Sequence, residues 1–269
     1  GATAGSLHFL NVAVGNEALD IYGPGQSGNG ALQAAGTAAF GGPITLPSHL
    51  GVNVIAPAQL TFNGPITGAG RVNLANSGTF VFANSNNTYT GGLGIGDAGS
   101  KDSKATLAVD EAIPNAPLQN IPAKTVLTIN AGVKQTLRGL LGAGALRVMD
   151  AQSLLTLTGN FVTTFDGSIS GAGTIHYTGT GQQRFTSAIN SWTGRLIVDS
   201  GLVYLINAQV SADATVEDGG ALWLSGTAAT GSVVVHDGGA LFIENGATTA
   251  ATVNTDDLEI AAGAGLRLD

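Results

Sequence analysis

The segment Val216–Leu224 (VEDGGALWL) recurs as Val235–Ile243 (VHDGGALFI), 19 residues further along the chain. Each copy joins a glycine-rich turn to a short apolar run, so a turn and a strand are repeated together. A unit of this length leaves no room for a crossover helix. The repeat therefore predicts stacked coils in which Leu222 lies on Leu241 and Leu224 lies on Ile243.

A longer repeat supports the same architecture. Thr61–Leu93 aligns without a gap to Thr164–Leu196 at an offset of 103 residues, and Thr136–Leu146 is a shorter relative. The offset corresponds to about five units of roughly twenty residues. Parallel strands from successive units would stack about 4.8 Å apart around a continuous core. We therefore predict an all-β fold, a right-handed parallel β-helix (β-solenoid) of roughly a dozen coils, with the hand taken from the preference of parallel crossovers.

Composition narrows the function classes. The 269 residues are 43% hydrophobic and only 10% charged, include 41 glycines and carry a net charge of −8. No basic run exists, which disfavours nucleic acid and anionic membranes as partners. Cysteine is absent, which excludes disulfides and cysteine-based metal sites. No apolar run reaches the roughly 18 residues of a membrane span.

The chain reads as one β-helix over residues 1–269 and as a segment of a longer protein. Its start lacks the basic region of a signal peptide, and its last residues, 258–269 (LEIAAGAGLRLD), stop inside a strand pattern. Charged residues and three prolines between Ser100 and Thr125 predict a loop insertion, residues 100–125, with one helical turn at most. Gly23–Gly30 (GPGQSGNG) is a second expected loop.

Two short segments carry a resemblance to a known family. Asn86–Gly92 (NNTYTGG) and its weaker copy Ile189–Arg195 (INSWTGR) resemble the autotransporter-associated β-strand repeat of bacterial autotransporter passenger domains. The resemblance covers most of residues 28–269 and departs from the family pattern at Gln182–Arg184. The residues assigned to the structural repeat motif are Asn87, Tyr89, Thr90, Gly91, Asn190, Trp192, Thr193 and Gly194.

The resemblance implies a function class. It implies a passenger exported through the outer membrane to the bacterial cell surface, a rigid and non-catalytic scaffold for adhesion or host interaction. The implied partners are host matrix, host cell surfaces or sister bacteria, with self-association as a further possibility. No cofactor is expected. The alternative is a polysaccharide-acting β-helix enzyme or a tailspike-like module.

Motifs with possible chemistry are weak. Gly23–Gly28 matches G-x-G-x-x-G, but no acidic residue follows between Asp20 and Asp97, so a plain loop is favoured over a dinucleotide site. Gly91–Asp97 approaches a calcium-binding nonapeptide, but its spacing is one residue too long and nothing repeats it in tandem. No metal site is therefore predicted. The pattern Asn86–Thr88 is interpreted as a corner where asparagine side chains stack, not as a glycosylation site.

Catalytic residues are not predicted either. Adjacent Asp256 and Asp257 suggest the aspartate cluster of polygalacturonases, which are also parallel β-helices. The Gly-His-Gly and Arg-Ile-Lys segments of those enzymes are missing, and neighbouring residues on a strand point to opposite faces. The two aspartates are therefore interpreted as solvated turn residues. The four histidines, His8, His49, His176 and His236, are scattered without metal-ligand spacing.

One candidate contact surface remains. If Leu222 and Leu224 point into the core, alternation directs Trp223 outward, and the 19-residue repeat places Phe242 beside it. Two outward rings on adjacent coils would stack. Either a loop or further coils cover this pair, or it is a contact surface for a glycan or protein.

Overall fold

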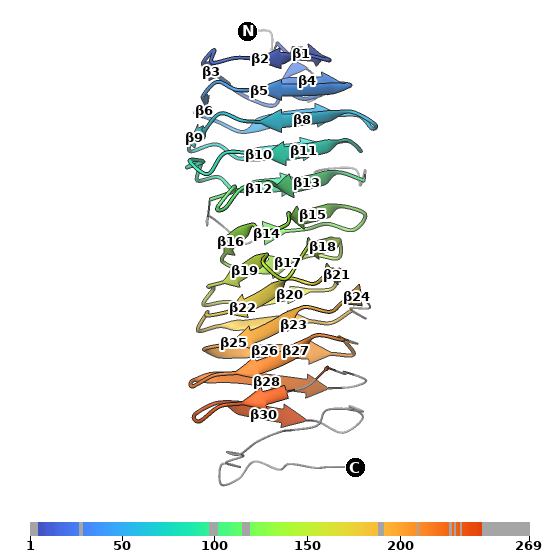
Figure 1. The fold of residues 1–269 in the computed structure, drawn as a ribbon. Helices are drawn as coiled ribbons and strands as arrows, with labels where there is room; N and C mark the ends of the chain where they lie inside the picture. The colour runs from blue at the N-terminus through green and yellow to red at the C-terminus, as the bar shows by residue number, and fades with distance from the viewer. Residues whose placement is uncertain are drawn as a thin grey trace.

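The computed structural model describes residues 5–26, 29–96, 102–114, 119–187, 191–208, 210–225, 228, 230–231 and 233–243. These residues wind into one rod of stacked turns, and the chain runs from one end of the rod to the other (Figure 1). All strand pairs are parallel and join neighbouring turns, which makes a β-solenoid of about ten turns with no α-helix in the described part. The predicted fold class is therefore confirmed.

Apolar and polar residues alternate along the short strands. In Thr79–Phe82 (β11), Phe80 and Phe82 are fully buried, whereas Thr79 and Val81 lie half-buried on the outer surface. The same alternation places Leu155 and Leu157 in the core. The side chains that point inward from each turn are therefore apolar, and they become buried when the turns stack. No described helix is long and apolar enough to cross a bilayer.

Six sheets form three faces along the rod, and one face is a single uninterrupted sheet. Its strands follow one another in sequence order, so each turn up to the one that contains Ser191–Trp192 (β24) contributes one strand to it. This nine-stranded sheet consists of Ala13–Val14 (β2), Thr37–Phe40 (β5), Gln59–Phe62 (β8), Thr79–Phe82 (β11), Lys104–Leu107 (β13), Val126–Ile129 (β15), Ala145–Val148 (β18), Ser168–Gly171 (β21) and Ser191–Trp192 (β24).

A second face is divided into three sheets. Its first sheet consists of Leu7–Leu10 (β1), Leu32–Ala35 (β4), Leu50–Val54 (β7), Val72–Ala75 (β10) and Leu93–Ile95 (β12). A two-stranded sheet follows, made of Gln119–Asn120 (β14) and Leu140–Leu141 (β17). The last sheet consists of Val162–Phe165 (β20), Gln182–Phe185 (β23), Gly201–Ile206 (β26), Gly220–Ser225 (β28) and Ala240–Ile243 (β30).

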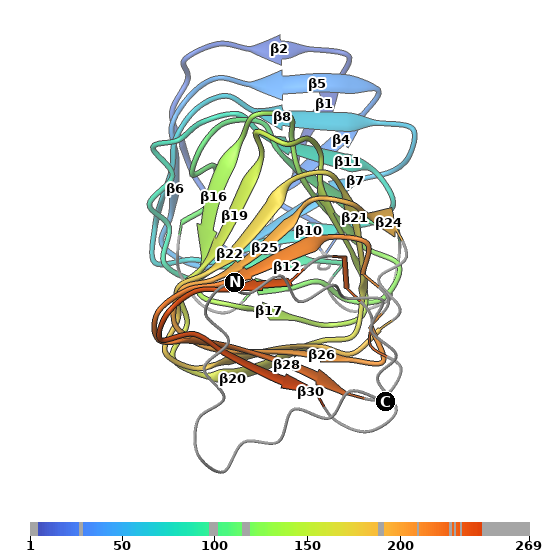
Figure 2. The ribbon, with the colours of Figure 1, turned by 60° about the horizontal axis from the view of Figure 1, so that its bottom comes forward.

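The third face is divided into two sheets. The first consists of Leu19–Asp20 (β3), Ile44–Leu46 (β6) and Ile66–Gly68 (β9). The second consists of Lys134–Leu137 (β16), Leu154–Leu157 (β19), Thr174–Tyr177 (β22), Arg195–Val198 (β25), Asp213–Val216 (β27) and Val233–Val235 (β29). Figure 2, which brings the C-terminal end forward, shows the strands running counter-clockwise as the chain approaches the viewer, which is a right-handed winding.

The two sequence repeats have different structural meanings. The 19-residue repeat is one turn of the rod, because Leu222 pairs with Leu241 and Leu224 pairs with Ile243, as predicted. The 103-residue repeat does not return to the same face. Ile66 lies on β9 of the third face, but its copy Ile169 lies on β21 of the nine-stranded sheet. The repeated unit is thus a local strand-turn-strand element that the solenoid accepts at different positions around its axis.

The expected loop insertion at residues 100–125 is wrong for part of its length. Lys104–Leu107 is strand β13 in the middle of the nine-stranded sheet, and Gln119–Asn120 is strand β14. Lys104 is exposed and its neighbour Ala105 is buried. The lysine therefore lies on the outer side of a regular strand and does not interrupt it. The described part of Gly23–Gly30 contains no strand, as expected, and Gly23, Gly25 and Gly30 have positive φ.

Candidate functional site

Three aromatic rings form a column on the outer surface of the last turns, on β26, β28 and β30. Tyr204 pairs with Trp223, and Trp223 pairs with Phe242. The ring centroids of Tyr204 and Trp223 are 5.4 Å apart with an interplanar angle of 29°, and those of Trp223 and Phe242 are 4.8 Å apart at 23°. The predicted outward stacking of Trp223 on Phe242 is therefore present. We call these three residues the aromatic ladder.

The guanidinium of Arg184 stacks on the N-terminal end of the aromatic ladder. Arg184 on β23 is the strand partner of Tyr204, and its guanidinium carbon lies 5.1 Å from the centre of the Tyr204 ring. Its Nη2 donates a hydrogen bond to Gln182 Oε1 at 3.2 Å, which holds the guanidinium in place. A cation over an aromatic face is favourable, especially when it is partly desolvated. Both faces of Tyr204 and both faces of Trp223 are thus covered.

The residues around the aromatic ladder are mostly small or apolar, with a few uncharged polar side chains. Val162 is 59% exposed, and Gln182, Leu202, Ala221 and Ala240 continue its column along the sheet. Every other aromatic residue in the described strands points into the core. We define the aromatic face as the outward residues of this sheet: Val162, Thr164, Gln182, Arg184, Leu202, Tyr204, Ile206, Ala221, Trp223, Ser225, Ala240 and Phe242.

The inner side of the same sheet is anchored by a buried glutamine. Gln183 on β23 is fully buried. Its Oε1 accepts from the Leu140 backbone N–H at 3.0 Å, and its Nε2 donates to the Leu140 carbonyl at 3.2 Å. The Thr163 hydroxyl, on the strand between them, also donates to Oε1 at 2.8 Å. Only an isolated bridge, Gly142 with Phe165, joins β17 to β20. Gln183 therefore replaces backbone pairing where the face is interrupted.

Other buried amides act in the same way at the remaining interruptions. Asn87 Oδ1 accepts from the Ile66 N–H and Asn87 Nδ2 donates to the Ala112 carbonyl, both at 2.7 Å. The Gln135 amide bonds both the N–H and the carbonyl of Ile113, at 3.2 and 2.9 Å. Asn87 was expected to stack on other asparagines at a corner. Instead it bonds the backbones of the turns on either side, because the third face has no regular strand there.

The two copies of the structural repeat motif occupy equivalent local surroundings. Tyr89 and Trp192 are fully buried. A Cβ on Gly91 would lie 2.5 Å from the Gly70 carbonyl carbon, and one on Gly194 would lie 1.9 Å from the Gly173 oxygen, so both positions require glycine.

These two buried aromatic residues differ in their polar contacts. The Trp192 Nε1–H donates to the Gly173 carbonyl at 2.8 Å. The Tyr89 hydroxyl has no hydrogen-bond partner, and burial raises the pKa of Tyr89. The N–H groups of Thr90 and Thr193 bond the carbonyls of Gly68 and Gly171 in the preceding turn. The described motif residues thus hold turns together, while Asn190 lies outside the described residues.

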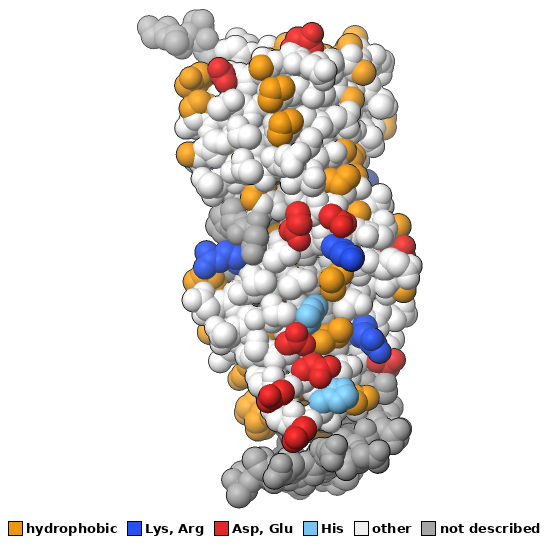
Figure 3. All heavy atoms as spheres, turned by 60° about the vertical axis from the view of Figure 1, so that its left-hand side comes forward, with side chains coloured by type: hydrophobic (Ala, Val, Ile, Leu, Met, Phe, Trp, Pro, Cys, Tyr) orange, Lys and Arg blue, Asp and Glu red, His pale blue; other side chains and the backbone are white. Residues whose placement is uncertain are grey.

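Acidic and histidine side chains gather at the corner that leads into the aromatic face, in the lower half of Figure 3. His176 Nε2 lies 2.6 Å from Asp199 Oδ2, and His236 Nε2 lies 3.9 Å from Glu217 Oε1. We call this group the acidic corner: Asp199, Glu217, Asp218, Asp237, His176 and His236. Across the described residues, no three carboxylates, histidines or cysteines are placed to hold a metal ion.

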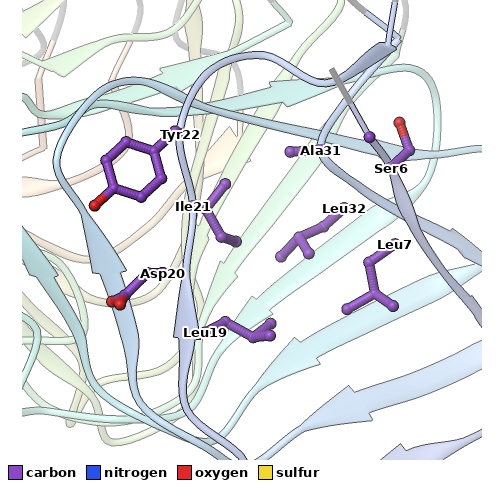
Figure 4. A pocket seen from close by; sticks show the side chains of 9 residues that line it. Ser6, Leu7, Leu19, Asp20, Ile21, Tyr22, Ala31 and Leu32 are labelled. Carbon is purple, nitrogen blue, oxygen red and sulfur yellow. The ribbon is translucent and has the colours of Figure 1, made fainter. Parts of the chain in front are cut away.

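The opening at the N-terminal end of the rod is apolar (Figure 4). This cavity of about 320 Å³ is lined by Leu7, Leu19, Ile21 and Leu32, with Asp20 and Tyr22 at its rim. Leu19 packs on the core cluster, and Ile21 and Leu32 belong to it. The cavity is therefore the end of the hydrophobic core and not a separate chemical site. Asp97, Asp256 and Asp257 lie outside the described residues.

Two site residues were missed from the sequence. Tyr204 precedes Trp223 by the same 19 residues that separate Trp223 from Phe242, so the repeat offset could have found it. Its turn lacks the Gly-Gly-Ala-Leu signature, which hid the relation. Arg184 carries no such signal, because the spacing from Arg184 to Tyr204 is 20 residues and its side chain is charged.

Comparison with known proteins finds one curated relative. The chain is similar to a curated protein described as "Adhesin BmaC autotransporter" from Brucella suis biovar 1 (strain 1330), with 32% identity over 152 residues. The alignment covers 55% of this chain and 4% of that protein, so the chain spans a small part of its relative. No protein-family model and no solved structure matches. Similarity and fold together confirm the predicted resemblance to autotransporter passenger domains.

Proposed function

We propose that this chain is a non-catalytic segment of an autotransporter passenger, a rigid rod that supports adhesion at a bacterial cell surface. One combined observation carries the proposal: a parallel β-solenoid of about ten turns has sequence similarity to an autotransporter adhesin. In such a rod, the buried columns keep the turns in a fixed register. Outward residues are then free to vary, and they decide what the rod contacts.

The aromatic face is the contact surface that we assign to this rod. Trp223 and Phe242, together with Tyr204, are the aromatic side chains on the outside of the described strands. Aromatic residues are enriched at protein contact sites, where a few of them supply most of the binding energy. In the structural repeat motif, in contrast, the side chains of Asn87, Tyr89 and Trp192 are buried and support the rod itself.

Adhesion can be measured directly. Latex beads coated with the chain are expected to bind host cells, immobilised matrix proteins or bacterial surfaces, and beads coated with Trp223→Lys are expected to bind less. Ile55→Lys is the matched control, because Ile55 is an exposed apolar residue outside the aromatic face. Beads that bind none of these surfaces would contradict the proposal. Release of reducing ends from pectin or bacterial polysaccharides by the chain would support the enzymatic alternative instead.

A further inference from the structure

We propose that the rod is hinged near its middle, between the turn that contains β11 and β12 and the turn that contains β13 and β14 (Figure 1). The paired strands β11 and β13 form the hinge, and the other two faces open on the opposite side. We call this place the mid-rod joint. The inference concerns the motion of the rod and goes beyond its proposed function, because it does not depend on what the rod adheres to.

The nine-stranded sheet crosses the mid-rod joint without a break. All four residues of β11 pair with the four residues of β13, just as β8 pairs with β11 one turn earlier. At the edge of this face, the Lys104 N–H donates to the Gly78 carbonyl at 3.1 Å, and the Ser103 hydroxyl donates to the Asn76 carbonyl. This face is therefore as firmly paired at the joint as it is in the preceding turn.

The other two faces lose their backbone pairing at the mid-rod joint. On the second face, β12 and β14 belong to different sheets, and the described part of the third face has no strand between β9 and β16. Two side-chain amides bridge the gap. Asn87 Nδ2 donates to the Ala112 carbonyl at 2.7 Å, and Gln119 Nε2 donates to the Leu93 carbonyl at 3.3 Å. Among the described residues, one hydrogen bond therefore crosses the joint on each of these faces.

The next junction towards the C-terminus is held much more firmly on the same two faces. Glu111 accepts from both the N–H and the hydroxyl of Thr136, and Asp110 accepts from the Lys134 N–H at 2.8 Å. The Gln135 amide adds two hydrogen bonds to the backbone of the preceding turn, and β14 pairs with β17. All turns from β13 onward therefore belong to one block, the C-terminal block, residues 102–243.

The junction towards the N-terminus is equally well bonded. The N–H groups of Thr88 and Thr90 donate to the carbonyls of Ile66 and Gly68, both at 2.9 Å. On the second face, three residues of β10 pair with β12. The turn that contains β11 and β12 is thus fixed to the turns before it and forms the end of an N-terminal block, residues 5–96. The two blocks meet at the mid-rod joint.

A buried polar group at the joint favours its opening. Tyr89, in the last turn of the N-terminal block, is fully buried, and its hydroxyl has no hydrogen-bond partner. Its counterpart in the second copy of the motif, Trp192, lies inside the C-terminal block and donates to the Gly173 carbonyl. An unsatisfied buried hydroxyl raises the free energy of the closed rod, and water can bond to it once the joint opens. Opening therefore breaks few hydrogen bonds and gains one.

The expected motion is a rotation of one block against the other. Hinges absorb such a rotation in a few residues while the packed blocks stay intact. Rotation about β11 and β13 keeps their ladder, breaks the Asn87 and Gln119 bonds, and uncovers Ala112, which is fully buried in the closed rod. The aromatic face lies in the C-terminal block, so it could turn towards a surface independently of the N-terminal block.

Four buried alanines allow the opening to be measured at four places. The chain has no cysteine, so each Ala→Cys variant carries one thiol, and its labelling rate reports how often that site opens. Ala112 lies on the open side of the joint, and Ala105 lies in the same turn at the hinge. Ala38 is inside the N-terminal block and Ala214 is inside the C-terminal block. Ala112→Cys should be labelled at least about 10-fold faster than the other three variants.

Substitutions at the joint should change this rate in opposite directions. In the Ala112→Cys chain, Asn87→Ala or Gln119→Ala removes one bridging bond and should raise the labelling rate about 5- to 10-fold. Tyr89→Phe removes the unsatisfied hydroxyl and should lower the rate at least about 5-fold. Gln183→Ala is the matched control, because it removes a buried amide inside the C-terminal block and should leave the rate unchanged.

Several results would overturn the hinge. Equal labelling of all four thiols would show unfolding of the whole chain, and fast labelling of Ala38→Cys would show that the N-terminal block unravels. Equal rates for Ala105→Cys and Ala112→Cys would show that the two turns separate completely. A rate at Ala112→Cys that neither Asn87→Ala nor Gln119→Ala changes would contradict the role of the bridging amides. Bead adhesion is measured separately, so a rod without a hinge leaves the proposed function standing.

Discussion

Replacing Gln183 with leucine tests whether buried amides hold the interrupted face together. The substitution leaves the Leu140 N–H and carbonyl without their partners at 3.0 and 3.2 Å. Each buried, unsatisfied backbone group costs about 1–3 kcal/mol, and the added apolar side chain returns about 1–2 kcal/mol. Thr163 keeps a partner, because its hydroxyl also reaches the Gln182 carbonyl at 3.3 Å. The two terms leave a net loss of up to about 5 kcal/mol in the free energy of unfolding, with a central value of about 2.5 kcal/mol.

Denaturant unfolding followed by circular dichroism measures this loss, and hydrogen exchange locates it. The Leu140 amide should lose its protection, whereas amides in the nine-stranded sheet keep theirs. Gln182→Leu is the matched control, since the same substitution one residue away changes an outward side chain and should cost less than about 1 kcal/mol. A Gln183→Leu chain as stable as the parent, with Leu140 still protected, would refute the assigned role.

Three further outcomes are expected. Trp223→Ala should lower the free energy of unfolding by about 1–2 kcal/mol, because only ring contacts on the outer surface are lost. Phe62→Ala empties a core site and should lower it by about 3–5 kcal/mol. Thermal melts in the reverse order would show that Trp223 points into the core. Burial raises the pKa of Tyr177 to about 12, above its unfolded value of about 10. The stability that the neutral hydroxyl contributes is therefore complete below about pH 10 and is lost as the pH rises toward 12. In an alkaline titration, the absorbance change that reports tyrosine ionisation and the dichroism change that reports unfolding should occur together. The hydrogen bond from the Ser153 hydroxyl lowers the pKa of Asp150. The stability that ionised Asp150 contributes is therefore present above the pKa of the unfolded chain and is lost as the pH falls through the pKa of the folded chain. Asp150→Asn should make the free energy of unfolding less dependent on pH at the acid end.

The strand phase of the last turns was predictable from sequence because two copies preserve the same glycine turn and apolar alternation. That pattern places Leu222 inward and Trp223 outward, and the structure agrees. Strand Lys104–Leu107 was missed because nearby charges and prolines suggested a loop. In a solenoid, the outward half of every strand tolerates charge, so local composition is a poor guide there.

The role of Gln183 could not be predicted. The sequence marks Gln182–Arg184 as a departure from the family pattern, but the partner of Gln183 is Leu140, 43 residues earlier. An interruption between two sheets arises from how turns of unequal length stack, which no local window contains. The buried amide becomes intelligible only when the unpaired backbone groups opposite it are known.

The uneven pairing along the rod has a mechanical consequence. Hydrogen bonds between turns point along the rod axis, so a pull on the two ends loads them in tension, and the junction with the fewest of them opens first. Between β12 and β14 the second face changes sheet and the described part of the third face has no strand, so the load passes to the nine-stranded sheet and to buried amides such as Gln135. A rod pulled along its axis would therefore yield first near its middle, leaving two blocks of intact turns joined by extended chain, so that it lengthens under force before the contact breaks.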